Sequence, residues 1–357
     1  MRDEFRRIFG LREAGVYYAL ALLVATLAVV TAALGRPNYL SPLNLTNILY
    51  QSSLIAIMGV AMTVVLITGN FDLSVASVAA LAAAVHISVM DSTGFWPAVA
   101  AALTVSGVIG LLNGAMVQFV GVNAFIVTLG TLTAVRGLVL IVTNGRSLMV
   151  EDPGSLATMT AFESGRAGPV PYPVLYMAAF TLVVWSVLRF TTVGRRVYAV
   201  GGNAEAARLS GINVHAYKLG AFILSSLAAG FAGVLFGCRF GAINPTALQG
   251  EELTVIAAAV LGGTSLFGGA GSVLKTVAGA LLLFTLTNGF NILNLGANYQ
   301  GVIEGTVLVA AAAIYTLGGR RSARPRLASR GSAKVFDQGE GAHRPETHVS
   351  RGTREAK

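Results

Sequence analysis

The stretch from Arg189 to Lys218 reads RFTTVGRRVYAVGGNAEAARLSGINVHAYK and is the longest polar interruption in the middle of an otherwise apolar sequence. Against the single acid Glu205 it carries the basic residues Arg189, Arg195, Arg196, Arg208 and Lys218. Asn203 can cap a short helix after a Gly201-Gly202 hinge, Glu205 suits the first turn, and Gly211 can end it. So short a helix is unstable alone in water, so we expect it to dock against its own bundle or a partner.

The composition around this stretch is that of a polytopic membrane protein. The chain has 357 residues, 54 % of them hydrophobic and only 11 % charged, whereas soluble domains have roughly 25 % charged residues. Much of the net charge of +9 falls in the tail from Gly318 to Lys357. Beside so much apolar sequence, this predicts a cytoplasmic, disordered tail rather than a nucleic-acid-binding one. The single cysteine, Cys238, excludes an internal disulfide and fits a small packing residue.

Ten apolar segments come close to the ~20 residues that cross a bilayer. The first follows a basic arm and is longer than a signal-peptide core of ~7–15 residues, so we interpret it as a retained span with a cytoplasmic N-terminus. The predicted spans are Val16–Leu34, Ile48–Thr68, Leu73–Met90, Phe95–Val120, Ala124–Thr143, Val174–Phe190, Leu219–Cys238, Leu253–Phe267, Val273–Leu293 and Gly301–Leu317. The third and eighth are weak, and either could be a broken or re-entrant helix.

The predicted fold class is therefore all-α and polytopic. Residues 1–15 form a cytoplasmic arm, residues 16–317 the transmembrane domain with its inner loop 189–218, and residues 318–357 the tail. Spans two to five and seven to ten begin from opposite sides, and Gly94–Gly114 weakly resembles Gly271–Gly289. Two interpretations stay open here: an inverted repeat, as in many transporters, or chance likeness between helices rich in small residues.

The polar residues within the spans are few, and we weigh each against a bland interpretation. Asp72 starts the third span and fits either a helix cap or a gating role. The uncharged polar residues could line a path for a neutral polyhydroxyl solute, or simply bond across helices. They are Asn70, Asn113, Thr128, Asn288 and Asn291. The candidate path residues are Asn70, Asp72, Asn113, Thr128, Asn288 and Asn291. His86 stands alone, which favours a structural role.

No arrangement in the sequence indicates catalysis, a metal site or a bound cofactor. The glycine-rich segment Leu261–Ser272 (LGGTSLFGGAGS) lacks the Gly-Lys-Ser/Thr ending of a phosphate loop, so a bent membrane helix is the better interpretation. We see no Ser/His/Asp set and no Cys/His cluster. Uphill transport would then draw its energy from another subunit or from an ion gradient.

Four stretches together resemble a known family. They are GNFDLSVASVAAL (Gly69–Leu81), VNAFIVTLGTLTAVRGL (Val122–Leu138), TTVGRRVYAVGGNAEAARLSGINV (Thr191–Val214) and ELTVIAAAVLGGTSLFGGAGSV (Glu252–Val273). In this order they are similar to the permease subunits of bacterial ATP-binding-cassette (ABC) importers for simple sugars of the ribose, xylose, galactose and autoinducer-2 type. The chain departs from the usual pattern at Asn70, Phe71, Ala76 and Ala124, which makes the sugar harder to infer.

The resemblance implies a non-enzymatic, multi-pass subunit of the bacterial inner membrane, with both termini cytoplasmic, that moves a ribose-like monosaccharide or polyol. It implies a homodimer, two ATPase subunits that bind ATP and Mg, and a periplasmic sugar-binding protein. The segment Asn203–Gly211 matches the helix that docks on the ATPase. Its candidate contacts are Asn203, Glu205, Ala206, Ala207, Arg208, Ser210 and Gly211. Glu205→Lys or Ala207→Trp should then abolish uptake.

Two other classes of function stay open. A stand-alone carrier driven by protons or sodium would need ionisable groups inside the spans, and the sequence has almost none. A membrane enzyme would need a catalytic set, and none is recognisable.

Overall fold

The computed structural model describes residues 11–294, 302 and 305–306. These residues belong to one compact unit, while the predicted tail and most of the predicted cytoplasmic arm lie outside the described residues. The elements are α2 (Leu11–Ala33), α3 (Pro42–Ile67), α4 (Val75–Thr93), α5 (Phe95–Ala115) with a π-helical continuation (Met116–Val120), α6 (Ala124–Thr143), β1 (Leu148–Met149), α7 (Pro153–Ser164), β2 (Arg166–Ala167), β3 (Val170–Pro171), α8 (Tyr172–Phe190), α9 (Thr192–Gly202), α10 (Ala204–Leu209), α11 (Val214–Phe240), β4 (Ala242–Ile243), α12 (Glu251–Leu261) and α13 (Val273–Leu293).

The predicted all-α membrane architecture is confirmed. Eight helices among the described residues are long and apolar enough to cross a bilayer, and they correspond to the first seven predicted spans and the ninth. The tenth predicted span, Gly301–Leu317, lies almost wholly outside the described residues. The four β-strands have two residues each and form two antiparallel pairs, β1 with β4 and β2 with β3. These pairs connect loops at one end of the bundle.

The two weak spans differ. The third, predicted as Leu73–Met90, is an unbroken helix, α4. The eighth, predicted as Leu253–Phe267, is not a full span, because α12 stops at Leu261 after 11 residues. At 1.5 Å per residue it extends about 16 Å, roughly half of a ~30 Å hydrocarbon core. At Gly262, which directly follows α12, a Cβ would stand 2.6 Å from the backbone carbonyl carbon of Lys275 on α13. The chain therefore turns at a position with no room for a side chain.

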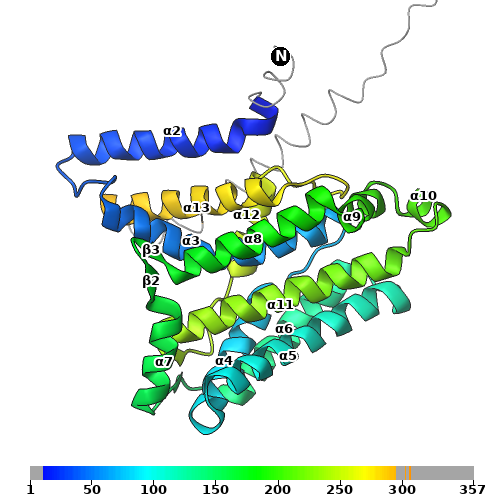
Figure 1. Cartoon of the computed structure of the whole chain (residues 1–357), viewed down its shortest axis with the longest axis horizontal. Coiled ribbons are helices and arrows are strands. Elements are labelled where there is room, and N and C mark those ends of the chain that lie inside the picture. Colours follow the sequence, from blue (N-terminus) through cyan, green and yellow to red (C-terminus); the bar gives the residue numbers. More distant parts are fainter. Residues whose placement is uncertain (1–10, 295–301, 303–304, 307–357) are drawn as a thin grey trace, which may run out of the picture. The chain divides into compact units, whose positions relative to one another are not determined.

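Successive helices run in alternating directions between two ends of the bundle. One end carries α9 and α10, and the other carries α7, β2 and β3 (Figure 1). We call them the α10 end and the α7 end. The helix α8 joins the two ends, starting directly after β3 and stopping just before α9. Asp91, near the end of α4, accepts hydrogen bonds from the backbone N–H of Glu151 and Asp152, which places the end of α4 at the α7 end. This alternation agrees with the predicted order of inner and outer loops.

Glycines let the central helices approach closely. A Cβ at Gly110 on α5 would stand 2.8 Å from the carbonyl oxygen of Phe222 on α11, and one at Gly233 on α11 would overlap the carbonyl oxygen of Ala79 on α4. Small residues at such positions are typical of membrane helix interfaces, where association depends on close packing. These two glycines therefore serve close packing of α11 against α4 and α5. The inverted repeat stays a prediction.

Candidate functional site

Helix α10 has the ends that its sequence predicts. The Asn203 side chain accepts a hydrogen bond from the backbone N–H of Ala206 at 3.0 Å, so Asn203 is the N-cap. At the other end Ser210 is the C-cap and Gly211 follows in the left-handed conformation, with φ of +79°. Arg208 donates to Glu205 at 2.7 Å, and this bond raises the pKa of the Arg208 guanidinium. The helix is short, but its ends are satisfied locally.

The exposed side chains of α10 differ from the predicted contact set in two ways. Ala207 is only 4 % exposed and packs in a small apolar cluster with Val200 and Val214, so its side chain anchors α10 to its own chain. Its predicted role as a partner contact is therefore wrong. Leu209 is not among the predicted contacts, and its side chain is 80 % exposed. A single exposed leucine is ordinary by itself, and Leu209 becomes a candidate partner contact because it is the last residue of α10. Its exposure could not be seen without the fold.

The two glycines before α10 are helical rather than a loop. Gly201 and Gly202 are the last residues of helix α9. A Cβ at Gly201 would overlap the carbonyl oxygen of Ile67, the last residue of α3, whereas one at Gly202 would meet nothing within 4 Å. Gly201 is therefore needed for close approach between α9 and the end of α3, and the predicted hinge at this pair is wrong.

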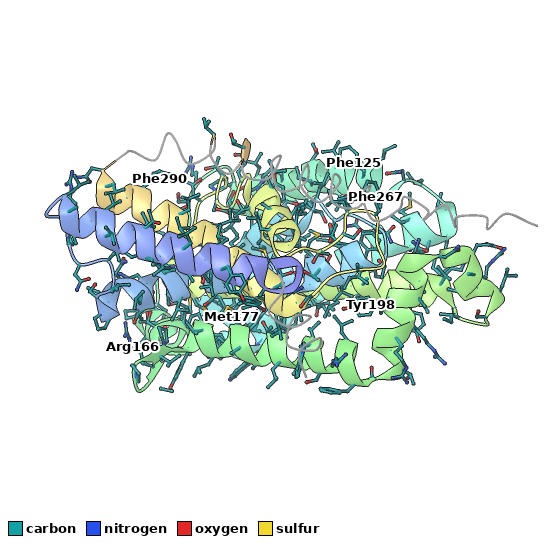
Figure 2. The ribbon with its side chains drawn as sticks, turned by 90° about the horizontal axis from the view of Figure 1, so that it is seen from above. Phe125, Arg166, Met177, Tyr198, Phe267 and Phe290 are labelled. Atoms are coloured by element: carbon teal, nitrogen blue, oxygen red, sulfur yellow. The ribbon has the colours of Figure 1, made fainter. Side chains whose placement is uncertain are left out.

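A third segment meets the same place. The backbone N–H of Gly269 donates to the carbonyl of Ile67 at 2.9 Å, and the Tyr198 hydroxyl on α9 donates to the carbonyl of Gly271 at 2.9 Å. Figure 2 shows Tyr198 beside the yellow segment that follows α12. Burial raises the pKa of Tyr198, so its hydroxyl stays protonated as a donor. Helix α9 thus joins α10 to the end of α3 and to the glycine loop, residues 262–272.

The end of α3 leads directly into a buried polar network. Asp72 accepts hydrogen bonds from the backbone N–H and hydroxyl of Ser74, at 3.0 and 2.6 Å, and from the hydroxyl of Ser225 on α11 at 2.8 Å. Asn113 on α5 donates to the Ser74 hydroxyl at 3.0 Å and accepts from Thr131 on α6 at 2.6 Å. We call these five residues the Asp72 cluster. Ser74 directly precedes α4 and makes no side-chain cap bond, whereas the Asp72 carboxylate accepts the backbone N–H of Ser74, which agrees with the capping interpretation of Asp72.

The predicted path residues do not form one open path. Asn70, Asp72, Asn113 and Thr128 are all buried. Thr128 bonds back to the carbonyl of Ala124 on its own helix, and Asn70 bonds to Thr68. Asn288 exchanges hydrogen bonds with Asn44 near the α7 end, far along the helices from the Asp72 cluster. Asn291 is exposed. In this conformation the buried amides bond within the bundle, which favours the alternative interpretation.

A polar pocket of about 310 Å³ opens at the α7 end. Arg239, near the end of α11, lies over the ring of Tyr50 on α3 at 4.2 Å from its centroid, and Thr46, Asn47 and Arg166 complete much of the wall. Arg239 lies in the last turn of α11, where solvation at a helix end would be enough to account for its charge. Its aromatic partner lies nearly two hundred residues earlier, so no local signal could reveal the pair.

Side chains that could bind a metal ion are not gathered in the described part of the chain. No group of three or more His, Cys, Asp or Glu side chains there is close enough to hold a metal ion. His86 is fully buried, has no hydrogen-bond partner, and meets Phe95 edge to face with ring centroids 5.6 Å apart. Cys238 is buried too.

The chain is similar in sequence to a family of permeases and to permeases for several sugars. A family model described as the permease component of the branched-chain amino acid transport system matches residues 44–312. The ribose import permease of Escherichia coli K12 is 41 % identical over 293 residues, which cover 82 % of this chain and 90 % of the relative. The D-allose permease of the same strain is 34 % identical, covering 84 % and 90 %, and the L-arabinose permease is 37 % identical, covering 81 % and 88 %. No solved structure matches the chain.

Proposed function

This chain belongs to the permease family of the branched-chain amino acid transport systems, and from that premise we propose that it is the membrane subunit of an ABC importer for a simple sugar. The relatives named above are permeases for ribose, allose and arabinose, which favours a monosaccharide over an amino acid. The chain itself carries out no catalysis. ATP and Mg are bound by a separate ATPase, and a solute-binding protein delivers the sugar.

The observation that carries this proposal is α10, a capped helix with an exposed leucine at its end, which packs closely on the rest of the chain. Its support is continuous: α10 packs through Ala207, α9 meets the end of α3 at Gly201, and the connection after α3 leads into the Asp72 cluster. An ATPase that moved α10 would therefore move α9, α3 and the glycine loop together. ATP binding can shift the equilibrium between outward-open and inward-open states only if it favours one of them. Movement of these connected elements would supply that preference.

The two ends of the bundle then take opposite roles. The α10 end and both chain termini are on the cytoplasmic side, and the α7 end is on the periplasmic side. The polar pocket at Arg239 and Tyr50 lies at the α7 end, where the binding protein would release its sugar. A second permease would pack on the side carrying Phe125 and Phe267. These two side chains are 52 % and 78 % exposed and lie on the same side of the bundle (Figure 2).

The test is to change the tip of α10 without changing its fold. The permease, its ATPase and its binding protein are co-expressed, and Leu209→Asp is compared with Leu209→Met. Burying a charge in place of a leucine should weaken ATPase binding by on the order of tenfold or more. ATPase co-purification and substrate-stimulated ATP hydrolysis should fall together in Leu209→Asp and persist in Leu209→Met.

Full activity of a well-inserted Leu209→Asp variant would contradict the docking role. Uptake by the purified chain alone in liposomes under a proton or sodium gradient would instead favour the ion-coupled alternative. The substrate class is tested separately, by thermal shift of the binding protein against pentoses, hexoses, polyols and branched-chain amino acids. Stabilisation by an amino acid alone would overturn the sugar assignment.

A further inference from the structure

A second cavity, of about 420 Å³, lies between the membrane-crossing helices α8 and α11 and reaches α3 and α9. Its wall is apolar apart from one hydroxyl, that of Tyr217, and it includes Val64 on α3, Val184 on α8, Val197 on α9 and Leu224 on α11. We call it the α8–α11 groove. It opens outward, because Val183, which lines it, is 62 % exposed. Its volume falls in the range of ~300–1,000 Å³ typical of ligand sites.

The groove ends beside a row of cations. Arg196 on α9 is exposed and donates to the hydroxyl of Tyr217, a wall residue, at 3.1 Å, so the guanidinium is held at the edge of the groove. Arg189 and Arg195 are exposed on the adjoining turns. No acidic residue occurs in the sequence between Glu163 and Glu205, and neither Arg195 nor Arg196 has a carboxylate partner among the described residues.

We propose that the α8–α11 groove binds one acyl chain of an anionic phospholipid, whose phosphate lies against Arg196 and its neighbours. The guanidinium group matches phosphate in charge and geometry, and basic clusters at a membrane surface attract anionic lipid. The amphipathic helix α9 suits this position, since Val197 faces the groove while Arg195 and Arg196 face outward. The lipid would touch both the bundle and the helix that carries α10.

A second copy of the chain fits this groove less well. Two copies inserted in the same orientation would bring their arginine rows together at the same depth, where like charges repel. The groove also lies along α8, whose Met177 is on the opposite side of the bundle from Phe125 and Phe267 (Figure 2). Lipid is therefore the occupant that the charges and the placement favour.

The experiment uses Gly220, which lines the groove and at which a Cβ would meet nothing within 4 Å. Gly220→Leu therefore fills the groove from within without displacing backbone. Gly130→Leu on α6 is the matched control, because a Cβ there also meets nothing within 4 Å and Gly130 does not line the groove. Arg196→Gln tests the phosphate contact separately.

The full-length permease is purified from membranes containing phosphatidylglycerol and phosphatidylethanolamine, and retained lipid is counted by native mass spectrometry. Wild type and Gly130→Leu should keep phosphatidylglycerol, and Gly220→Leu should lose it. Arg196→Gln should lower the preference for phosphatidylglycerol by about tenfold, the effect of one lost charge-assisted contact. Equal retention by Gly220→Leu, or no headgroup preference in wild type, would overturn the proposal.

A photoreactive phosphatidylglycerol with its probe in the acyl chain gives a readout that needs no variant. Cross-links should map to peptides of α8 and α11. Cross-links confined to other helices, or efficient disulfide formation between two permeases carrying Val183→Cys, would assign the groove to another occupant. Retained lipid is measured without transport, so this result is independent of the sugar and of ATPase docking.

Discussion

The Asp72 cluster and helix α10 are both polar interruptions in an apolar chain, and their polar groups are satisfied in opposite ways. Asp72, Asn113 and Ser225 are buried, and each bonds to another member of the cluster. In α10 the backbone is capped locally, and the side chains other than Ala204 and Ala207 are exposed. The difference teaches that the Asp72 cluster joins the start of α4 to α5, α6 and α11, whereas most side chains of α10 stay exposed and available to a partner.

The largest effect is expected at the contact that links the two regions. Gly201→Ala would place a Cβ on the carbonyl oxygen of Ile67, and overpacking of this kind costs about 1–3 kcal/mol or more. The end of α9 would have to move away from α3, so uptake should be lost. Gly202→Ala, one residue on, should transport like wild type, because a Cβ at Gly202 would meet nothing within 4 Å. Equal uptake by the two variants would show that α9 need not touch α3.

A smaller effect, confined to stability, is expected in the buried region. Asp72→Leu would leave the backbone N–H and hydroxyl of Ser74 and the hydroxyl of Ser225 without their acceptor. A buried donor without a partner costs about 1–3 kcal/mol, so the thermal unfolding midpoint in detergent should fall at a fixed heating rate. The exposed Asn291→Leu should leave it unchanged. An unchanged midpoint for Asp72→Leu would contradict the structural role of the cluster.

The smallest effect on stability is expected in the exposed region, at the pair of Glu205 and Arg208. Because solvent screens exposed pairs, Glu205→Lys should not change the unfolding midpoint, yet uptake should fall if the ATPase contacts this surface. The double exchange Glu205→Arg with Arg208→Glu separates the two roles. If the pair acts only within α10, the exchange should restore uptake. If each side chain meets a fixed partner group, uptake should stay low.

The parts of this structure that the sequence predicts are those set by local rules. Span length and apolarity located eight crossing helices, and Asn203 and Gly211 marked α10 because a cap acts within a few residues of itself. The partners of Asp72 and Gly201 come from helices far along the chain, and residue type alone cannot identify them. An amide in an apolar span can line a path or bond a neighbouring helix, and only the fold distinguishes the two. The same limit hid the exposure of Leu209.

The carbonyl oxygen of Ile67 is contacted by α9 and by Gly269, a residue roughly two hundred positions later in the chain. Synthesis proceeds from the N-terminus, so α9 and α10 leave the ribosome well before the glycine loop that completes their mount. Until that loop arrives, α9 contacts the end of α3 but lacks the hydrogen bond from Tyr198 to Gly271. Docking of an ATPase on α10, as proposed above, would therefore be firm only on a chain that has been made beyond the glycine loop, residues 262–272.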